Sequence, residues 1–101
     1  MREMDMIRNI AVYTWKADTT QEQIDGLERA LKALKIPGVT NIHMSRDLGL
    51  RPGNLGGALT CDIADAETYK VWDANEEHNR IRRELAAPIA EKVERVQIRL
   101  D

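Results

Sequence analysis

The sequence predicts an α+β domain in which four antiparallel strands carry helices on one face, the ferredoxin-like β-α-β-β-α-β arrangement. The first observation is a set of four segments rich in β-branched and aromatic residues, which are typical of strands: 6–16, 39–47, 57–64 and 92–100. The second is that the apolar spacing changes to the helical period after the first strand and again before the last. Because these patterns fill 101 residues, we expect one domain over 1–101.

The first strand, "MIRNIAVYTW", is apolar on both of its faces. Ile10 and Val12 share one face. The other face carries Ala11, Tyr13 and Trp15. Helices cover only one face of such a sheet, so the second face would leave an unusually large apolar patch in water. A twofold dimer whose two sheets face each other buries that patch, and we therefore expect a homodimer.

The segment after this strand contains signals for the start, the middle and the end of a helix. Thr19 followed by Glu22 has the pattern of a capping box, which satisfies free N–H groups at the start of a helix. One apolar stripe at helical spacing follows: Ile24, Leu27, Leu31 and Leu34. Pro37 and Gly38 then predict the end of the helix.

The helical pattern before the last strand is divided in two. Asp65 is a suitable N-cap for a short helix over 66–73. Asn75 is a suitable N-cap for a second helix over 76–87. We therefore expect a broken second helix.

Composition and charge argue against several classes of protein. A net charge of −2 and a pI of about 5.7 disfavour nucleic acid as a partner. No apolar run approaches the roughly 20 residues that cross a bilayer, so no membrane partner is expected. The N-terminal "MREMDMIRNI" lacks the continuous apolar segment of a signal peptide, which favours a cytoplasmic protein. The single cysteine, Cys61, excludes an internal disulfide and is expected to be a small core residue.

His78 is the main candidate for chemistry. With Asn75 as N-cap it occupies the third helical position, on one stripe with Ile81 and Leu85, so its side chain is expected to point toward the sheet. The positive end of the helix disfavours the imidazolium form. A neutral, inward imidazole suits a general base near pH 7. The alternative is a packed histidine that is hydrogen-bonded to the backbone, and both interpretations stay open.

Four further residues are candidates for the same pocket. Tyr69 and Trp72 share a helical face, where packing in the core is the simpler interpretation. In the functional interpretation they wall a pocket beside His78, with Trp72 stacking on a flat substrate. Asn9 and Tyr13 join them if their strand face is the helix side, with Asn9 as a donor to a carbonyl oxygen.

Two residues outside these elements are also candidates for binding a substrate. His43 lies on a strand face with polar neighbours, and the absence of a nearby carboxylate motif argues against a metal site. Arg51 lies among glycines in a loop and has the chemistry to hold a carboxylate or phosphate, although a solvated connection is the simpler interpretation. We expect the loop 47–56 to be mobile and to border the pocket mouth. The run "RIRRE", which includes Arg82, is typical of a solvated helix face.

The segments "IAVYTWKADTTQEQIDGLERALKALKIPGV" and "VWDANEEHNRIRRELAAPIAEKVERVQIRL" resemble the stress-responsive A/B barrel (Dabb) family. The shared marks are a first strand followed by lysine, a T-x-E-Q-like helix start, Pro-Gly after the helix, and a short helix ending in an aromatic residue six positions before a histidine. The resemblance implies a dimeric α+β barrel made of two ferredoxin-like units. The family includes stress-associated proteins and a plant polyketide cyclase that forms olivetolic acid without a cofactor.

The resemblance also implies roles for individual residues. His78 matches the catalytic histidine of the cyclase, whereas Trp72 stands where the cyclase has its catalytic tyrosine. Tyr69, one helical turn earlier, is the candidate to supply that hydroxyl. Asn9 replaces a histidine that many members carry on the first strand, and Gly57 replaces another pocket histidine of the cyclase. These differences make the cyclase reaction itself an unsuitable assignment.

The sequence and the resemblance together predict a small enzyme without a cofactor or metal. It is expected to act on a carbonyl-bearing, polyketide-like or aromatic small molecule through acid–base chemistry at His78, as a cyclase, an aldol or retro-aldol lyase, or an isomerase. The alternative is a non-catalytic dimeric protein with a stress-responsive or ligand-binding role. A cofactor-free monooxygenase on a similar barrel is a third option, which these sequence marks do not favour.

Overall fold

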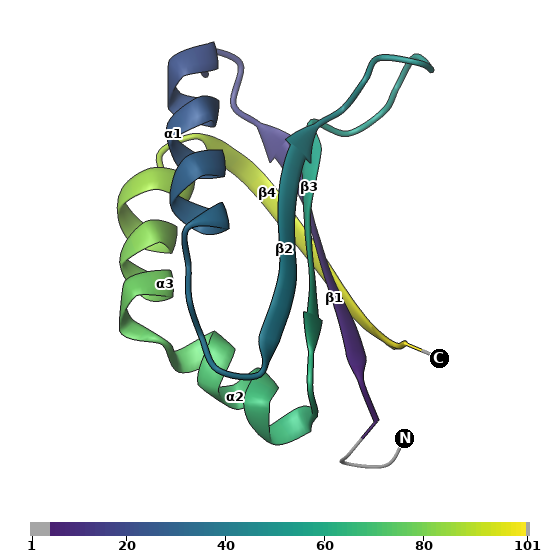
Figure 1. Ribbon diagram of the computed structural model, residues 1–101. Coiled ribbons are helices and arrows are strands. Elements are labelled where there is room, and N and C mark those ends of the chain that lie inside the picture. The colour runs from purple at the N-terminus through teal and green to yellow at the C-terminus, as the bar shows by residue number, and fades with distance from the viewer. Residues whose placement is uncertain (1–4, 101) are drawn as a thin grey trace.

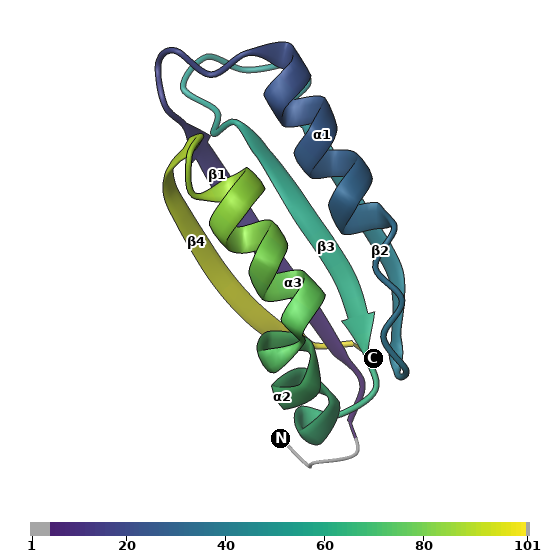
Figure 2. The same ribbon diagram turned by 90° about the vertical axis from the view of Figure 1, so that its left-hand side faces the viewer.

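The structure is a computed structural model that describes residues 5–100. Its elements are β1 (Ile7–Trp15), α1 (Gln21–Lys32), β2 (Val39–Arg46), β3 (Gly57–Ile63), α2 (Ala66–Ala74), α3 (Glu76–Ile81), the π-helical turn η1 (Arg82–Ala86) and β4 (Ala90–Arg99). The sheet has the order β2-β3-β1-β4 with antiparallel neighbours. The helices cover one face of the sheet, and the other face is open (Figures 1 and 2). The predicted ferredoxin-like β-α-β-β-α-β fold is confirmed.

The core lies between the helices and the covered face of the sheet. From α1 it receives the predicted stripe of Ile24, Leu27, Leu31 and, just beyond the helix, Leu34. Alternate residues of β1 reach the same core, because Ala11 and Tyr13 are buried while Ile10 and Val12 are half-buried on the other face. The first strand therefore has apolar side chains on both faces of the sheet, as the sequence predicted, and the helices cover only one of these faces.

The start of α1 differs from the prediction by one residue. Thr20, and not Thr19, is the N-cap, and its hydroxyl accepts a hydrogen bond from the Gln23 N–H at 3.1 Å. The Gln23 side chain accepts from the Thr20 N–H at 2.9 Å, which completes the capping box. The Thr19 hydroxyl instead donates to the carbonyl oxygen of Ile89 at 3.2 Å, so a tertiary contact removes it from the cap.

The end of α1 also comes earlier than Pro37. The helix ends at Lys32, and the chain then continues without regular structure while Leu34 and Ile36 stay buried. The Val39 N–H donates to the carbonyl of Ile36 at 3.0 Å, which closes a turn around Pro37. Helix-type hydrogen bonds stop at the Leu34 N–H, which donates to the carbonyl of Leu31 at 3.2 Å, and core packing holds the rest of the connection in place.

The second helical segment is broken where the sequence predicted. The Asp65 carboxylate accepts from the Thr68 N–H at the start of α2, and the Asn75 side chain accepts from the His78 N–H at the start of α3. Beyond α3 the chain widens into η1, in which the Ala87 N–H donates to the carbonyl of Arg82 at 2.8 Å. No pattern in the sequence predicted this π-helical turn.

The open face of the sheet and the β2–β3 loop expose apolar side chains among polar ones. Val96 and Ile98 of β4 are exposed on this face, where their strand neighbours on β1 are Ile10 and Arg8. The loop leaves the sheet on the side away from the helices (Figure 1) and exposes Leu48 and Leu50 by 80% and 84%. Within residues 5–100, no helix has the length and apolar character to cross a membrane.

Candidate active site

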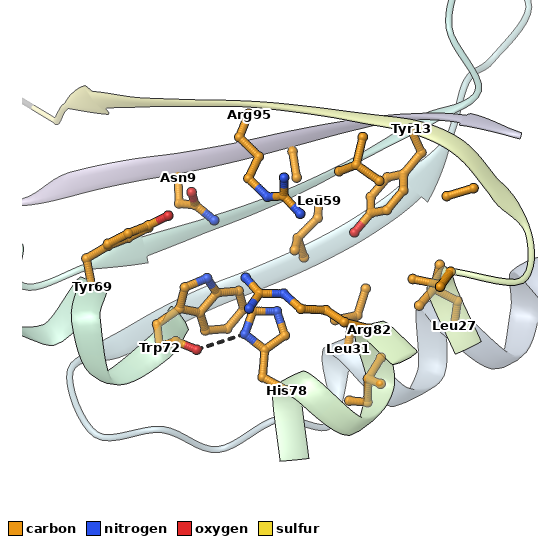
Figure 3. Close-up of a pocket in the computed structure, with 16 residues that line it drawn as sticks. Asn9, Tyr13, Leu27, Leu31, Leu59, Tyr69, Trp72, His78, Arg82 and Arg95 are labelled. Atoms are coloured by element: carbon orange, nitrogen blue, oxygen red, sulfur yellow. Dashed lines mark hydrogen bonds between the residues drawn. The ribbon is translucent and has the colours of Figure 1, made fainter. Parts of the chain in front are cut away.

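A cavity of about 220 Å³ lies between the sheet and the helices (Figure 3). Its apolar walls come from α1, β3 and the α3–η1 segment, including Leu27, Leu31 and Leu59. Its polar lining is formed by Asn9, Tyr13, Tyr69, His78, Arg82 and Arg95. His78 and the four residues predicted to share its pocket line this one cavity. The four are Asn9, Tyr13, Tyr69 and Trp72.

His78 is held in a single orientation at the base of this cavity. The side chain is only 3% exposed, and its backbone N–H donates to the Asn75 side chain at 2.9 Å. The ring atom Nδ1 lies 2.8 Å from the carbonyl oxygen of Trp72 (Figure 3). The two rings are also in contact, with centroids 4.1 Å apart and planes inclined at 44°. Backbone, ring face and ring nitrogen are thus all fixed by local neighbours.

The contact with Trp72 determines which ring nitrogen carries the proton. A backbone carbonyl can only accept a hydrogen bond, so Nδ1 of His78 must be the donor. In a neutral imidazole this leaves Nε2 without a proton, as an acceptor. Within residues 5–100, every fully buried side-chain nitrogen or oxygen has a hydrogen-bond partner. Among those residues no partner is seen for Nε2, which therefore retains access to solvent at the cavity.

The electrostatic surroundings keep His78 neutral. Burial is the main cause that lowers its pKa below the usual 6.5, and the positive charges of Arg82 and Arg95 lower it further. The hydrogen bond to the Trp72 carbonyl and the charge of Asp73 act in the opposite direction and do not reverse the shift. A neutral imidazole with a free Nε2 is the form that accepts a proton.

The sheet supplies hydrogen-bonding groups on the opposite side of the cavity. Asn9 is buried, and its side-chain oxygen accepts from the Gln97 amide at 2.8 Å, which orients the Asn9 amide group. Burial raises the pKa of Tyr13, although Arg95 and Arg82 oppose this, so the phenol stays protonated near neutral pH. Figure 3 shows its hydroxyl directed into the cavity. Tyr13 is therefore placed to donate a hydrogen bond.

The two aromatic residues of α2 differ in their surroundings. Trp72 is 1% exposed and packs in the core, and it also lines the cavity. Both predictions for Trp72, as a core residue and as a wall of the pocket, therefore describe it. Tyr69 is half-buried at one end of the cavity, with its hydroxyl directed toward Asn9 (Figure 3). Tyr69 therefore brings a second phenol hydroxyl to the cavity.

Arg82 and Arg95 were not among the predicted site residues. Arg82 is the first residue of η1 and was expected on the solvated helix face, but it lines the cavity. Its guanidinium is bound at 2.9 Å to the Asp73 carboxylate and to the side-chain oxygen of Asn79. Arg95 lies on β4 opposite Ala11, and this pairing directs it toward the covered face. The sequence signal for Arg95 was its alternation with Val96, which does not tell which face is covered.

His43 and Arg51 do not lie at this cavity. His43 is exposed on the open face, where it lines a second, shallower hollow of about 640 Å³ together with Leu48 and Leu50. Arg51 is exposed in the β2–β3 loop and lines neither hollow. The loop 47–56 borders the open-face hollow, so the expectation that it borders the mouth of the His78 cavity is wrong. Its mobility stays a prediction.

The remaining candidate groups do not add a nucleophile or a metal centre to the described residues. Burial raises the pKa of the Cys61 thiol to about 11, so the thiol is protonated and lies in the core, as predicted. In the part of the chain from Asp5 to Leu100, no three His, Cys, Asp or Glu side chains are grouped as ligands for a metal ion. The chemistry of the cavity therefore centres on His78 and its hydrogen-bonding neighbours.

Comparisons with known proteins place this geometry among solved structures. No family profile matches the chain, and no curated protein matches its sequence. A dimeric ferredoxin-like protein of unknown function from Thermobifida fusca is 28% identical, with a TM-score of 0.88 over 95% of this chain and 92% of its own. Hydroxynitrile lyase from Passiflora edulis is 17% identical, with a TM-score of 0.82 over 97% and 95%. A Dabb family protein with a ferredoxin-like fold from Mesorhizobium loti is 20% identical, with a TM-score of 0.75 over 96% and 99%.

These likenesses define the class of protein by its fold. The chain is an α+β ferredoxin-like protein. Its structural neighbours include the Dabb family protein, and the neighbours from Thermobifida fusca and Bacteroides fragilis are described as dimeric. The resemblance to the Dabb family that the sequence indicated is thus confirmed in the structure.

Proposed function

We propose that this protein is a small enzyme in which His78 acts as a general base or acid on a carbonyl-bearing small molecule, without a cofactor. The observation that carries the proposal is the contact between Nδ1 of His78 and the Trp72 carbonyl. It fixes the protonated nitrogen away from the cavity and leaves Nε2 as the proton acceptor. The lowered pKa of His78 keeps this acceptor available near neutral pH.

The proposed step is the removal of a proton next to a carbonyl group, or from the hydroxyl of an aldol-type adduct. Nε2 of His78 takes the proton. When the proton comes from carbon, the electron pair of the C–H bond forms a C=C bond and the π pair of the carbonyl moves onto its oxygen. When the proton comes from the hydroxyl of an adduct, the O–H pair forms a C=O bond, the adjacent C–C bond breaks, and its electron pair leaves with the carbon next to the second carbonyl, whose oxygen takes the charge. The phenol of Tyr13 or of Tyr69 donates a hydrogen bond to the oxygen on which charge develops. The imidazolium then returns the proton to the product.

The size of the cavity favours a compact substrate. At about 220 Å³ it is smaller than the roughly 300–1,000 Å³ of typical ligand pockets. A molecule with one ring or a short chain fits this space better than an extended polyketide. The name of the Passiflora edulis neighbour indicates that a protein of this fold can carry out lyase chemistry, which supports a lyase or isomerase over a cyclase of long chains.

The proposal includes a homodimer formed through the open face of the sheet. Ile10, Val12, Val96 and Ile98 give this face its apolar character, and the leucines of the β2–β3 loop extend it. The neighbours from Thermobifida fusca and Bacteroides fragilis are described as dimeric. Burial of this surface against a second copy is the simplest way to remove it from water.

A second candidate function is a dimeric protein that binds a ligand, or responds to stress, without catalysis. The favouring observation is the packing of His78, because a ring in contact with Trp72 and hydrogen-bonded to its carbonyl also describes a structural histidine. Within the described residues His78 has no acidic side chain as a hydrogen-bond partner. The two functions therefore require a test of the chemistry itself.

The test is exchange of carbon-bound hydrogen in heavy water. Acetophenone, phenylacetone and phenylpyruvate each carry exchangeable hydrogens next to a carbonyl, and proton NMR reports their loss over time. We expect catalysed exchange with the natural chain, a fall of about 10²–10⁴-fold in His78→Ala, and no fall in His43→Ala. His43, the other histidine of the chain, is the matched control because it lies on the open face. Equal exchange in His78→Ala, or none with any of the three compounds, would favour the non-catalytic function.

A further inference from the structure

Arg95 is a cation at the cavity that no carboxylate of residues 5–100 pairs with. It projects from β4 over the cavity, between Asn9 and Tyr13 (Figure 3). In the described part of the chain its guanidinium has no hydrogen bond or ion pair, although its charge acts on both Tyr13 and His78. A guanidinium carries five N–H donors in a planar fork, so Arg95 has donors available for a ligand.

Arg82 differs from Arg95 in this respect. Its guanidinium donates to the carbonyl and the carboxylate of Asp73, so its charge is compensated and its orientation is fixed. Asp73 itself lies outside the cavity lining, which within residues 5–100 contains two arginines but no aspartate or glutamate. The cavity therefore presents a net positive wall, with Arg95 as the cation that has free donors.

We propose that the cavity binds a small carboxylate, with the carboxylate group on Arg95 and the apolar part against the leucine and tryptophan walls. This inference rests on the proposed function only in taking the His78 cavity as the ligand site. A planar carboxylate of single charge matches one planar guanidinium, and the Tyr13 hydroxyl is directed to the same region. Arg95 thus takes the role that the sequence had suggested for Arg51. In the proposed enzyme the substrate class becomes carbonyl-bearing carboxylic acids.

The charge of the ligand has a consequence at His78. The positive charge of Arg95 is one of the causes that lower the pKa of His78, together with burial and Arg82. A carboxylate on Arg95 offsets that charge, so its binding should raise the pKa of His78. A neutral ligand of the same shape lacks this effect, which gives a readout that only binding inside the cavity produces.

The experiment compares benzoate with benzamide, which share a ring and a shape but differ in charge. Both are titrated into the natural chain, Arg95→Gln and Arg99→Gln, and NMR follows the indole N–H of Trp72 and the ring protons of His78. Arg99 lies on the same face of the same strand and does not line the cavity, so Arg99→Gln controls for loss of one positive charge. Arg95→Lys, which keeps the charge but loses the planar fork, provides a second variant at the site.

We expect benzoate to bind the natural chain at least about fivefold more tightly than benzamide and to raise the pKa of His78. The preference should disappear in Arg95→Gln, fall in Arg95→Lys and persist in Arg99→Gln. Equal affinity for the two compounds, a preference that survives Arg95→Gln, or no binding of benzoate overturns the inference. Tighter binding of phenylphosphonate than of benzoate overturns the assignment to carboxylates.

The outcome is separable from that of the proposed function. Binding of benzoate through Arg95 does not require a proton acceptor, so the preference should persist in His78→Gln. If the natural chain prefers benzoate to benzamide but hydrogen exchange does not depend on His78, the carboxylate site is supported and the proposed catalytic function is not. If exchange depends on His78 while Arg95→Gln leaves the binding of benzoate unchanged, the enzyme stands and the carboxylate site falls.

Discussion

The ring nitrogen Nδ1 of His78 hydrogen-bonds the backbone carbonyl of Trp72 at 2.8 Å, across the junction between α2 and α3. Asn75, which begins α3, places the His78 ring beside the last turn of α2. The break in the helical segment is thus what allows a side chain of α3 to bond a carbonyl of α2. One contact sets the tautomer of the imidazole and joins two short helices.

Replacement of His78 by alanine should reduce activity far more than stability. The loss of one hydrogen bond and of the ring contact with Trp72 should lower the free energy of unfolding by about 1–3 kcal/mol. Thermal unfolding of His78→Ala measures this loss of stability, and thermal unfolding of His43→Ala is the control for removing an exposed histidine. Complete unfolding of His78→Ala, or unchanged turnover of an identified substrate, would contradict the catalytic assignment.

The stability of the protein should decrease as the pH falls below about 6.5, in part because of His78. Its pKa is lowered in the folded state, chiefly by burial, so between the two pKa values the unfolded chain binds a proton that the folded chain does not. The stability is therefore complete above the unfolded pKa and declines as the pH falls toward the folded pKa. Urea unfolding between about pH 7 and pH 5 should show a smaller decline in His78→Gln than in the natural chain. An equal decline in both proteins would contradict the lowered pKa.

Local signals in the sequence were sufficient for the order of elements but not for their ends. Thr19 with Glu22 and Thr20 with Gln23 both fit the capping pattern, and only the tertiary bond from Thr19 to the Ile89 carbonyl separates them. Pro37 sets the latest position at which α1 can end, whereas packing decides that it ends at Lys32. Such choices depend on contacts between distant parts of the chain.

A residue could be assigned to the candidate site from the sequence only where the pattern showed which face of its helix or strand points into the core. The period of α3 directed His78 toward the sheet, whereas the period of β1 grouped Asn9 with Tyr13 without showing that the helices cover their face. Arg95 was missed because the pattern of β4 alternates clearly without revealing which side the helices cover. His43 was assigned to the site for the same reason, since its strand face turned out to be the open one. Face assignment requires the strand pairing, which the sequence does not contain.

A charge on the open face should prevent the proposed dimer. Val96 is 50% exposed on this face, and Val71 of α2 is 54% exposed on a helix away from it. We expect Val96→Glu to sediment as a monomer of 11.5 kDa at micromolar concentration, because a buried charge without a partner is costly. Val71→Glu, the matched control, should sediment like the natural chain. A natural chain that is itself monomeric under these conditions would contradict the dimer.

Asp62 should contribute stability that is lost only in acid. Its carboxylate lies on the open face and accepts hydrogen bonds at 2.9 Å from Arg8 and from Asn41. The bond from Arg8, followed by that from Asn41, lowers the pKa of Asp62, so the folded state favours the ionised form. Its contribution is therefore full above the unfolded pKa of about 3.9 and disappears as the pH falls through the lower folded value.

The variant Asp62→Asn tests this assignment, because it keeps the shape of the side chain and removes its charge. We expect the free energy of unfolding at pH 7 to fall by about 1–3 kcal/mol, since Asp62 is buried and each bond involves a charged group. The difference between the two proteins should shrink as the pH falls below about 3.9. Glu67→Gln is the control, because the ion pair of Glu67 with Lys70 is exposed and should contribute less than about 1 kcal/mol. Urea unfolding of all three proteins at one concentration measures these values. A difference that stays constant with pH would show that Asp62 acts through its shape and not through its charge.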